Sequence, residues 1–139
     1  LYTLYGVVSI YYGDEVGMEG YADPLNRKFF EWDKVGNDLN KWFIKLGETR
    51  KKYSSFGKGN FVEVYCKNGI MVYKMIDENC ETLVAINNGL REIRLDFEGE
   101  LLEILSNKRH FKKVVLNVGE FGIFIKESVD FKSDNTLAF

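Results

Sequence analysis

Residues 6–33 read GVVSIYYGDEVGMEGYADPLNRKFFEWD, and they carry the most specific signal in the sequence. The run from Val7 to Tyr12 is almost continuously apolar, which is typical of a strand buried on both faces, as in a parallel sheet or a barrel. The run ends at Gly13, and the stretch from there to Asp33 is rich in glycine and acidic residues. Loops of this length in compact domains are usually functional or disordered. The pattern predicts a buried strand followed by a long loop.

The segment after this loop has the spacing of a helix over residues 38–53. Asn37 or Asp38 can cap its first turn, because both side chains accept hydrogen bonds from free backbone N–H groups. We interpret Trp42 and Phe43 as part of the buried side of a helix rather than as a platform for a ligand, because both fall on its apolar stripe. The apolar positions on one stripe of this helix are Leu39, Trp42, Phe43, Leu46 and Tyr53.

From Phe61 onward, short strand-like runs alternate with turns. Asn68-Gly69, Asn88-Gly89 and Gly119 supply the residue types that tight turns require. Many short strands at regular spacing are typical of an antiparallel sandwich or barrel. The predicted strands are Phe61–Cys66, Ile70–Ile76, Thr82–Asn87, Glu92–Phe97, Glu100–Leu105, Lys112–Val118 and Phe121–Lys126.

The composition is that of an ordinary globular domain of 139 residues, of which 45% are hydrophobic and 29% charged. The net charge of −2 gives no electrostatic reason to expect a nucleic-acid partner or an anionic membrane. No apolar run approaches the roughly 20 residues that span a bilayer. The first residues show no basic segment followed by an apolar stretch, so we expect no secretory signal.

Cys66 and Cys80 are predicted to be free thiols. Cys66 lies beside one predicted turn and Cys80 follows the next, so a whole strand separates them by more than a disulfide can span. Free thiols favour a reducing compartment, so we expect a cytoplasmic location. His110 is the only histidine, and without a Cys/His cluster we expect no metal and no cofactor. We interpret His110 as an exposed turn residue.

Residues 6–33 resemble the eighth barrel strand and the following loop of the α-amylase family, glycoside hydrolase family 13. The family's pattern there is approximately Gly-Val/Ile-Pro-x-Ile-Tyr-Tyr-Gly-Asp-Glu, then Gly-Met/Val, then Asp-Pro-x-x-Arg and a Trp. Val8 departs from it, because it stands where the family usually has proline. Within the family, the stretch is similar to the branch of cyclomaltodextrinases, neopullulanases and related pullulanases.

The resemblance implies a mainly β fold, with an antiparallel Greek-key β-sandwich like the family's C-terminal domain after the last strand, loop and helix of a (β/α)8 barrel. It divides the chain into strand eight with its active-site-face loop (1–35), the final barrel helix and linker (36–58), the sandwich (59–127) and a tail (128–139). The family's catalytic acids belong to barrel strands four, five and seven. Retaining cleavage needs two of them about 5–5.5 Å apart, so we expect no catalytic residue in this chain.

Asp23, Arg27 and Trp32 are the candidate substrate-binding residues. The loop after a barrel strand lies at the face where such enzymes build their active sites. A carboxylate and a guanidinium can together bind sugar hydroxyls, and the resemblance implies that Asp23 and Arg27 bind the sugar on the non-reducing side of the cleavage point. The alternative for this pair is a structural ion pair, and for Trp32 the alternative to stacking on a sugar ring is packing.

Other acidic residues look catalytic only at first sight. Asp14 and Glu15 follow the predicted strand directly, and we expect them to organise the loop by hydrogen bonding. Residues 93–100 read IRLDFEGE, which echoes the Arg-x-Asp of the family's strand-four nucleophile motif but comes after strand eight. Their charged residues alternate with apolar ones, so we interpret them as the outward face of a strand.

The activity that the resemblance implies is hydrolysis of α-glucosidic bonds in α-glucans such as maltodextrin, starch or pullulan, by a parent enzyme whose partner is an α-glucan oligosaccharide. This chain itself is expected to be inactive. The alternative function is a free-standing carbohydrate-binding or interaction module, which exposed aromatic residues clustered on one sandwich face would favour.

Outside a barrel, the strand at residues 7–12 would expose apolar side chains and unpaired backbone groups. We therefore expect it either to pack across the sandwich or to form a homodimer by pairing with a second copy. Tyr11 and Tyr12 within it are expected to pack in a core rather than to bind sugar.

Overall fold

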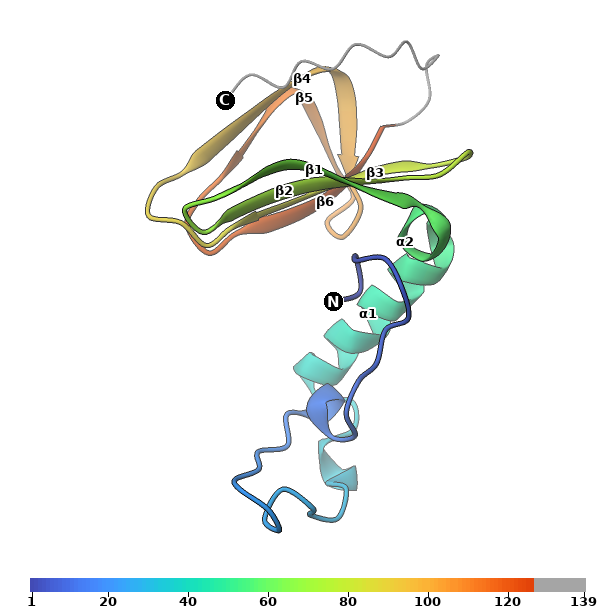
Figure 1. Cartoon of the computed structure of the whole chain (residues 1–139), viewed down its shortest axis with the longest axis vertical. Coiled ribbons are helices and arrows are strands. Elements are labelled where there is room, and N and C mark those ends of the chain that lie inside the picture. Colours follow the sequence, from blue (N-terminus) through green and yellow to red (C-terminus); the bar gives the residue numbers. More distant parts are fainter. Residues whose placement is uncertain (127–139) are drawn as a thin grey trace.

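The computed structural model describes residues 1–126, and its main unit is a six-stranded antiparallel sheet (Figure 1). The mainly β fold class is confirmed, whereas the predicted tail at 128–139 lies outside the described residues. The elements in order are η1 (Asp14–Val16), η2 (Trp32–Lys34), α1 (Asp38–Lys52), α2 (Ser55–Lys58), β1 (Asn60–Lys67), β2 (Ile70–Ile76), β3 (Glu81–Asn87), β4 (Ile93–Glu103), β5 (Lys108–Leu116) and β6 (Phe121–Ile125).

Turn chemistry accounts for the strand boundaries. Asn68 and Gly69 adopt φ values of 54° and 79°, as a two-residue hairpin turn between β1 and β2 requires.

The prediction was wrong at Gly99, where two strands were expected and the structure has the single strand β4. Gly99 has a φ of 83°, and the register with β5 shifts between Asp96 and Glu100, so the glycine makes an irregularity within the strand instead of a turn.

The strand order is β1-β2-β3-β6-β4-β5, so β6 lies between β3 and β4. The pairing of β6 with β4 is short, because it comprises only Leu102 with Ile125 and Glu103 with Phe124. The β4–β5 hairpin can therefore turn over one face of the other four strands, and Figure 1 shows it above them. The core between these two layers consists of Val72, Leu83, Ala85, Leu95, Leu101, Val114, Leu116 and Phe124.

A second core lies on the opposite face of the sheet, where α2 packs. Phe56 of α2 is fully buried there, and the Ser55 hydroxyl lies 3.0 Å from the Thr82 hydroxyl of β3. The Tyr73 hydroxyl lies 2.6 Å from the Thr3 hydroxyl, which ties the N-terminal segment to β2. The buried members of this core are Phe56, Tyr73, Met75, Val84 and Ile123.

The helix α1 begins where the sequence predicted. The Asn37 side chain accepts a hydrogen bond of 2.7 Å from the backbone N–H of Asn40 and so caps the first turn. Phe43 packs edge-on against Tyr2, with ring centroids 6.0 Å apart. The burial expected for Trp42 is wrong, because this side chain is 44% exposed. Residues 1–126 therefore cover the apolar stripe of α1 only in part.

The predicted strand at residues 7–12 does not form. This segment has no strand partner among the described residues, and Val7 and Tyr11 are 98% and 59% exposed. An extended segment needs neighbours for its N–H and C=O groups, and the sheet begins only at Asn60. Residues 10–12 lie against α1 instead of packing across the sandwich, so the burial expected for Tyr11 and Tyr12 is also wrong.

Arg50 of α1 holds the chain that leads into this segment. Its guanidinium donates hydrogen bonds of 2.7 Å to the carbonyl oxygens of both Tyr2 and Leu4. A third bond of 2.5 Å reaches the carbonyl oxygen of Gly6. One side chain therefore satisfies three backbone acceptors that have no strand neighbour.

Both cysteines are free, as predicted. His110 is not the exposed turn residue that was expected, because it lies in β5, is partly buried and packs edge-on against Phe124 at 5.7 Å. Burial, with a smaller effect of Lys108, lowers the pKa of His110 below its ordinary value of 6.5.

Replacing Phe56 with alanine is expected to lower the free energy of unfolding by about 3–5 kcal/mol, because the ring is fully buried and its loss leaves a cavity. Urea unfolding measures this change. Leu90→Ala is the control, since Leu90 is 97% exposed. Equal losses for both variants would contradict the position of the second core.

The stability of the protein is expected to fall as the pH drops from about 7.5 to about 5.5, because the unfolded chain takes up a proton on His110 near its ordinary pKa, whereas the folded chain takes it up only at a lower pH. Urea unfolding at three pH values measures the slope. His110→Gln should flatten it over this range, and an unchanged slope would show that His110 is not the group responsible.

Candidate functional site

Two asparagines of the α1 N-terminus fix the start of the loop that was predicted to carry the site. The Asn37 amide donates to the carbonyl oxygen of Val16 at 3.0 Å, and the Asn40 amide donates to that of Glu15 at 3.3 Å. Val16 itself is buried, with 1% of its surface exposed. The short helix η1 is thereby held against α1.

The two acidic residues at the start of the loop, Asp14 and Glu15, have different environments. The Glu15 carboxylate accepts a hydrogen bond of 2.8 Å from the backbone N–H of Gly13. Gly13 has a φ of 95°, a conformation that glycine adopts easily, and this lets the chain turn sharply into η1. Glu15 thus organises the loop as expected, whereas the Asp14 side chain is exposed to solvent.

The structure brings Asp23 and Arg27 together. Arg27 Nε lies 2.7 Å from one carboxylate oxygen of Asp23, and Nη2 donates to the other at 3.2 Å, which is a two-point contact. The side chains are 60% exposed for Asp23 and 70% for Arg27. The pair is therefore preformed and open to solvent.

Trp32, the third predicted site residue, contacts a different partner. Its ring lies edge-on against Phe30, with centroids 4.7 Å apart, and its side chain is 77% exposed. Nearby, Glu31 and Lys34 form an ion pair, and the Lys34 hydrogen bond lowers the pKa of the Glu31 carboxyl. Trp32 presents an open aromatic surface at this end of the loop.

A wide, open pocket of about 510 Å³ lies between the N-terminal segment and α1. It is separate from the Asp23–Arg27 pair, which does not line it. The Tyr12 hydroxyl on its rim donates a hydrogen bond of 3.0 Å to the carbonyl oxygen of Lys28 and so connects the pocket wall to the site loop. Its lining residues are Tyr2, Ile10, Tyr11, Tyr12, Glu15, Asn40, Phe43 and Ile44.

Residues 1–126 contain no group of three or more histidine, cysteine or acidic residues that could hold a metal ion. Within the same part of the chain, no helix combines the length and apolar character needed to cross a membrane.

Sequence reasoning missed two residues that position the loop. Asn40 looks like an ordinary helix residue, and Arg50 looks like a basic residue near a helix C-terminus, where it suits the helix dipole. Their partners, Glu15 and the carbonyl groups of residues 2, 4 and 6, lie 25 to 48 positions away in the sequence. No local pattern could have identified these contacts.

No family model matches the chain. An amylopullulanase from Thermoanaerobacter thermohydrosulfuricus is 27% identical over 126 residues, which are 91% of this chain and 8% of that protein. A cyclomaltodextrinase from a Bacillus species is 31% identical over 108 residues, which are 76% of this chain and 18% of that protein. The crystal structure of the α-amylase from Geobacillus thermoleovorans, complexed with acarbose, matches with a TM-score of 0.80 and 24% identity, over 92% of this chain and 32% of that one.

The fold is that of the C-terminal β domain of α-amylases, with the loop and helix that precede it. The chain is homologous to the C-terminal part of α-amylase-family enzymes, glycoside hydrolase family 13, and it matches the branch of cyclomaltodextrinases and pullulanases. It spans only a small share, 8% and 18%, of the length of these two curated relatives.

Replacing Asn37 with alanine is expected to cost about 1–2 kcal/mol of stability, because the helix loses its cap and η1 loses its bond to the Val16 carbonyl. Asn37→Asp keeps the capping oxygen and removes only the amide donor. Amide exchange should therefore accelerate in η1 for both variants but in the first turn of α1 only for Asn37→Ala. Protection of η1 in both variants would contradict this role of the Asn37 amide.

Proposed function

We propose that this chain works as the C-terminal part of an enzyme that hydrolyses α-glucosidic bonds in α-glucans such as maltodextrin, starch or pullulan. The observation that carries the proposal is that 91% and 76% of the chain match a small part of an amylopullulanase and of a cyclomaltodextrinase. The chain on its own is proposed to be inactive, because in the family it resembles the catalytic carboxylates belong to earlier barrel strands.

Within that enzyme, Asp23 and Arg27 are proposed to bind the substrate. Their two-point contact leaves lone pairs on the carboxylate and further N–H groups on the guanidinium, so the pair can still accept from and donate to sugar hydroxyls. An ion pair this exposed contributes only about 0–1 kcal/mol to the free energy of folding. A stabilising role therefore does not account well for the presence of this pair. Trp32 is proposed to offer its open ring to a sugar.

The proposed partner is an α-glucan oligosaccharide bound by the whole enzyme. One neighbour in fold, the Geobacillus thermoleovorans α-amylase, was solved with acarbose, which supports this partner class. We further propose a cytoplasmic location, supported only by the two free cysteines.

A carbohydrate-binding module is less well supported. Among the described strands, the aromatic side chains more than about a third exposed are Phe111 on β5 and Phe121 on β6. Phe111 pairs with Glu100 and lies on the outer side of the β4–β5 hairpin. Phe121 lies on the opposite face from its neighbour Gly122, which faces the core between the two layers. They do not form one aromatic face.

A homodimer through residues 7–12 is proposed for the chain when it is alone in solution. The support is the exposure of the apolar Val7 and Tyr11 in a segment whose backbone has no strand partner in the structure. Sedimentation equilibrium tests it, and a monomer with rapid amide exchange over residues 7–12 would contradict it.

The function is tested with a chimeric enzyme, in which this chain replaces the aligned segment of the Bacillus cyclomaltodextrinase. Release of glucose units from cyclomaltodextrin is measured for the chimeric enzyme and for the chain alone. Activity of the chimeric enzyme, and none for the chain alone, is the expected result. Activity of the isolated chain would overturn the proposed inactivity, and an inactive chimeric enzyme would count against the proposed function.

In the active chimeric enzyme, Asp23→Ala and Arg27→Ala are each expected to lower kcat/KM about 10- to 100-fold, as for the loss of a hydrogen bond to a charged group. Arg94→Ala is the matched control, because Arg94 and Asp96 form an exposed ion pair on β4, away from the loop. Thermal unfolding of the isolated chain should shift by no more than a degree or two in all three variants. A large loss of stability with no change in kcat/KM would show that the Asp23–Arg27 pair is structural.

A further inference from the structure

The sequence contains the dipeptide Asn-Gly twice, at Asn68-Gly69 and at Asn88-Gly89. Both lie at the same end of the sheet, because the first joins β1 to β2 and the second follows β3. The backbone N–H of Asn88 donates a hydrogen bond of 2.9 Å to the carbonyl oxygen of Gly69, so the two connections touch. The fold therefore places two identical dipeptides side by side.

Asn-Gly is the dipeptide in which asparagine deamidates most easily. The backbone nitrogen of the glycine loses its proton and attacks the carboxamide carbon of the asparagine side chain, a five-membered succinimide closes, and the side-chain nitrogen leaves as ammonia. Water then opens the ring to aspartate or isoaspartate, so water is the only co-reactant. Glycine favours the attack because it has no Cβ beside the reacting nitrogen and its backbone rotates freely. The rate therefore depends on whether water reaches the glycine N–H.

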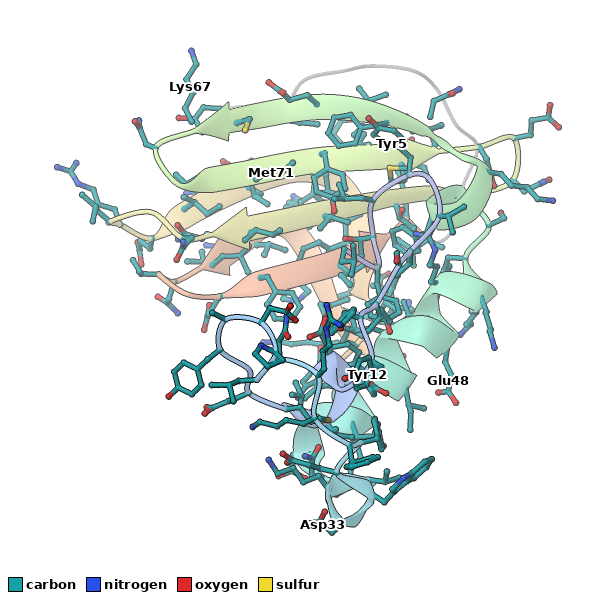
Figure 2. The ribbon with its side chains drawn as sticks, turned by 60° about the horizontal axis from the view of Figure 1, so that its bottom comes forward. Tyr5, Tyr12, Asp33, Glu48, Lys67 and Met71 are labelled. Carbon is teal, nitrogen blue, oxygen red and sulfur yellow. The ribbon has the colours of Figure 1, made fainter. Side chains whose placement is uncertain are left out.

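The reacting groups of Asn68-Gly69 are open to solvent. Both residues are exposed, and within residues 1–126 neither the Gly69 N–H nor the Asn68 carboxamide has a hydrogen-bond partner. Figure 2 shows Lys67, the last residue of β1, pointing outward from this end of the sheet. The turn must swing open for the nitrogen to reach the carboxamide carbon, and an exposed turn beside the edge strand β1 opens locally at low cost.

The corresponding nitrogen of Asn88-Gly89 is shielded. Gly89 is buried, and its N–H donates a hydrogen bond of 3.1 Å to the side-chain oxygen of the fully buried Asn87. The Asn87 side chain is itself fixed, because its amide donates to the carbonyl oxygens of Arg91 at 2.9 Å and Leu116 at 3.0 Å. Water does not reach the Gly89 nitrogen in the folded chain, although the Asn88 side chain is exposed.

We propose that Asn68 is a site of spontaneous deamidation and that Asn87 protects Asn88 from the same reaction. The products at position 68 are aspartate and isoaspartate, and each adds a negative charge at this end of the sheet. Isoaspartate also runs the main chain through its Cβ, which lengthens the turn by one atom. The turn has no room toward Asn88, because a Cβ on Gly69 would lie 2.4 Å from the Asn88 carbonyl oxygen. Isoaspartate is therefore expected to break the hydrogen bond between Asn88 and Gly69.

Peptide mapping by mass spectrometry tests the proposal on the chain itself. The folded chain and the chain unfolded in guanidinium chloride are incubated in the same mildly alkaline buffer, and the deamidated fraction at each asparagine is followed over time. In the unfolded chain Asn68 and Asn88 should react at similar rates, because glycine follows both. In the folded chain Asn68 should react about tenfold faster than Asn88 or more, since the Gly89 nitrogen is reached only when the structure opens.

Similar rates at the two asparagines of the folded chain would overturn the proposal, and so would a folded chain in which Asn68 does not react. Asn68→Gly is the control, because glycine adopts the φ of 54° at this position easily. This variant should lose the mass change in the first turn and keep the slow rate at Asn88.

The protection by Asn87 has its own readouts. Asn87→Ala removes the acceptor of the Gly89 N–H and should raise the rate at Asn88 about tenfold. Because this variant also loses two buried hydrogen bonds and can fail to fold, amide hydrogen exchange of the unchanged chain is measured as well. The Gly69 N–H should exchange rapidly and the Gly89 N–H slowly, and equal exchange would contradict the protection.

Discussion

Each β-strand must pair its backbone N–H and C=O groups with a neighbour, and this requirement divides the molecule into two parts. The strands β1 to β6 pair with one another in a single sheet and bury two cores, one on each face. Residues 7–12 have a strand-like sequence but no strand to pair with, so they remain irregular and exposed. Within residues 1–126, the six strands therefore have their strand neighbours in one sheet, whereas residues 7–12 have no strand partner.

Side-chain hydrogen bonds partly replace the missing strand neighbours. The Arg50 guanidinium binds three carbonyl groups of residues 2–6, and Asn37 and Asn40 bind the carbonyl groups of Val16 and Glu15. All three side chains belong to α1 or its cap, so the helix acts as the frame for the N-terminal segment. These contacts hold the segment beside the helix without burying its apolar side chains.

The candidate site, in contrast, is formed by contacts within the loop. Asp23 and Arg27 are four residues apart, and their ion pair forms within the loop itself, independently of the rest of the protein. The pair is exposed to solvent, so its remaining donors and acceptors are open to a ligand.

The sequence by itself determined the features that depend on neighbouring residues. The Asn68-Gly69 turn, the cap of α1 at Asn37 and most strand limits follow from local conformational preferences, and the motif in residues 6–33 indicated the family. Only the tertiary structure decided that β6 lies between β3 and β4, that Gly99 interrupts one strand instead of separating two, and that His110 is partly buried. These outcomes depend on which segments meet that are distant in the sequence. Strand pairing and burial are determined by contacts between strands, and residues adjacent in the sequence do not reveal those contacts. For the same reason the prediction of a buried strand at residues 7–12 was wrong, although the segment is apolar.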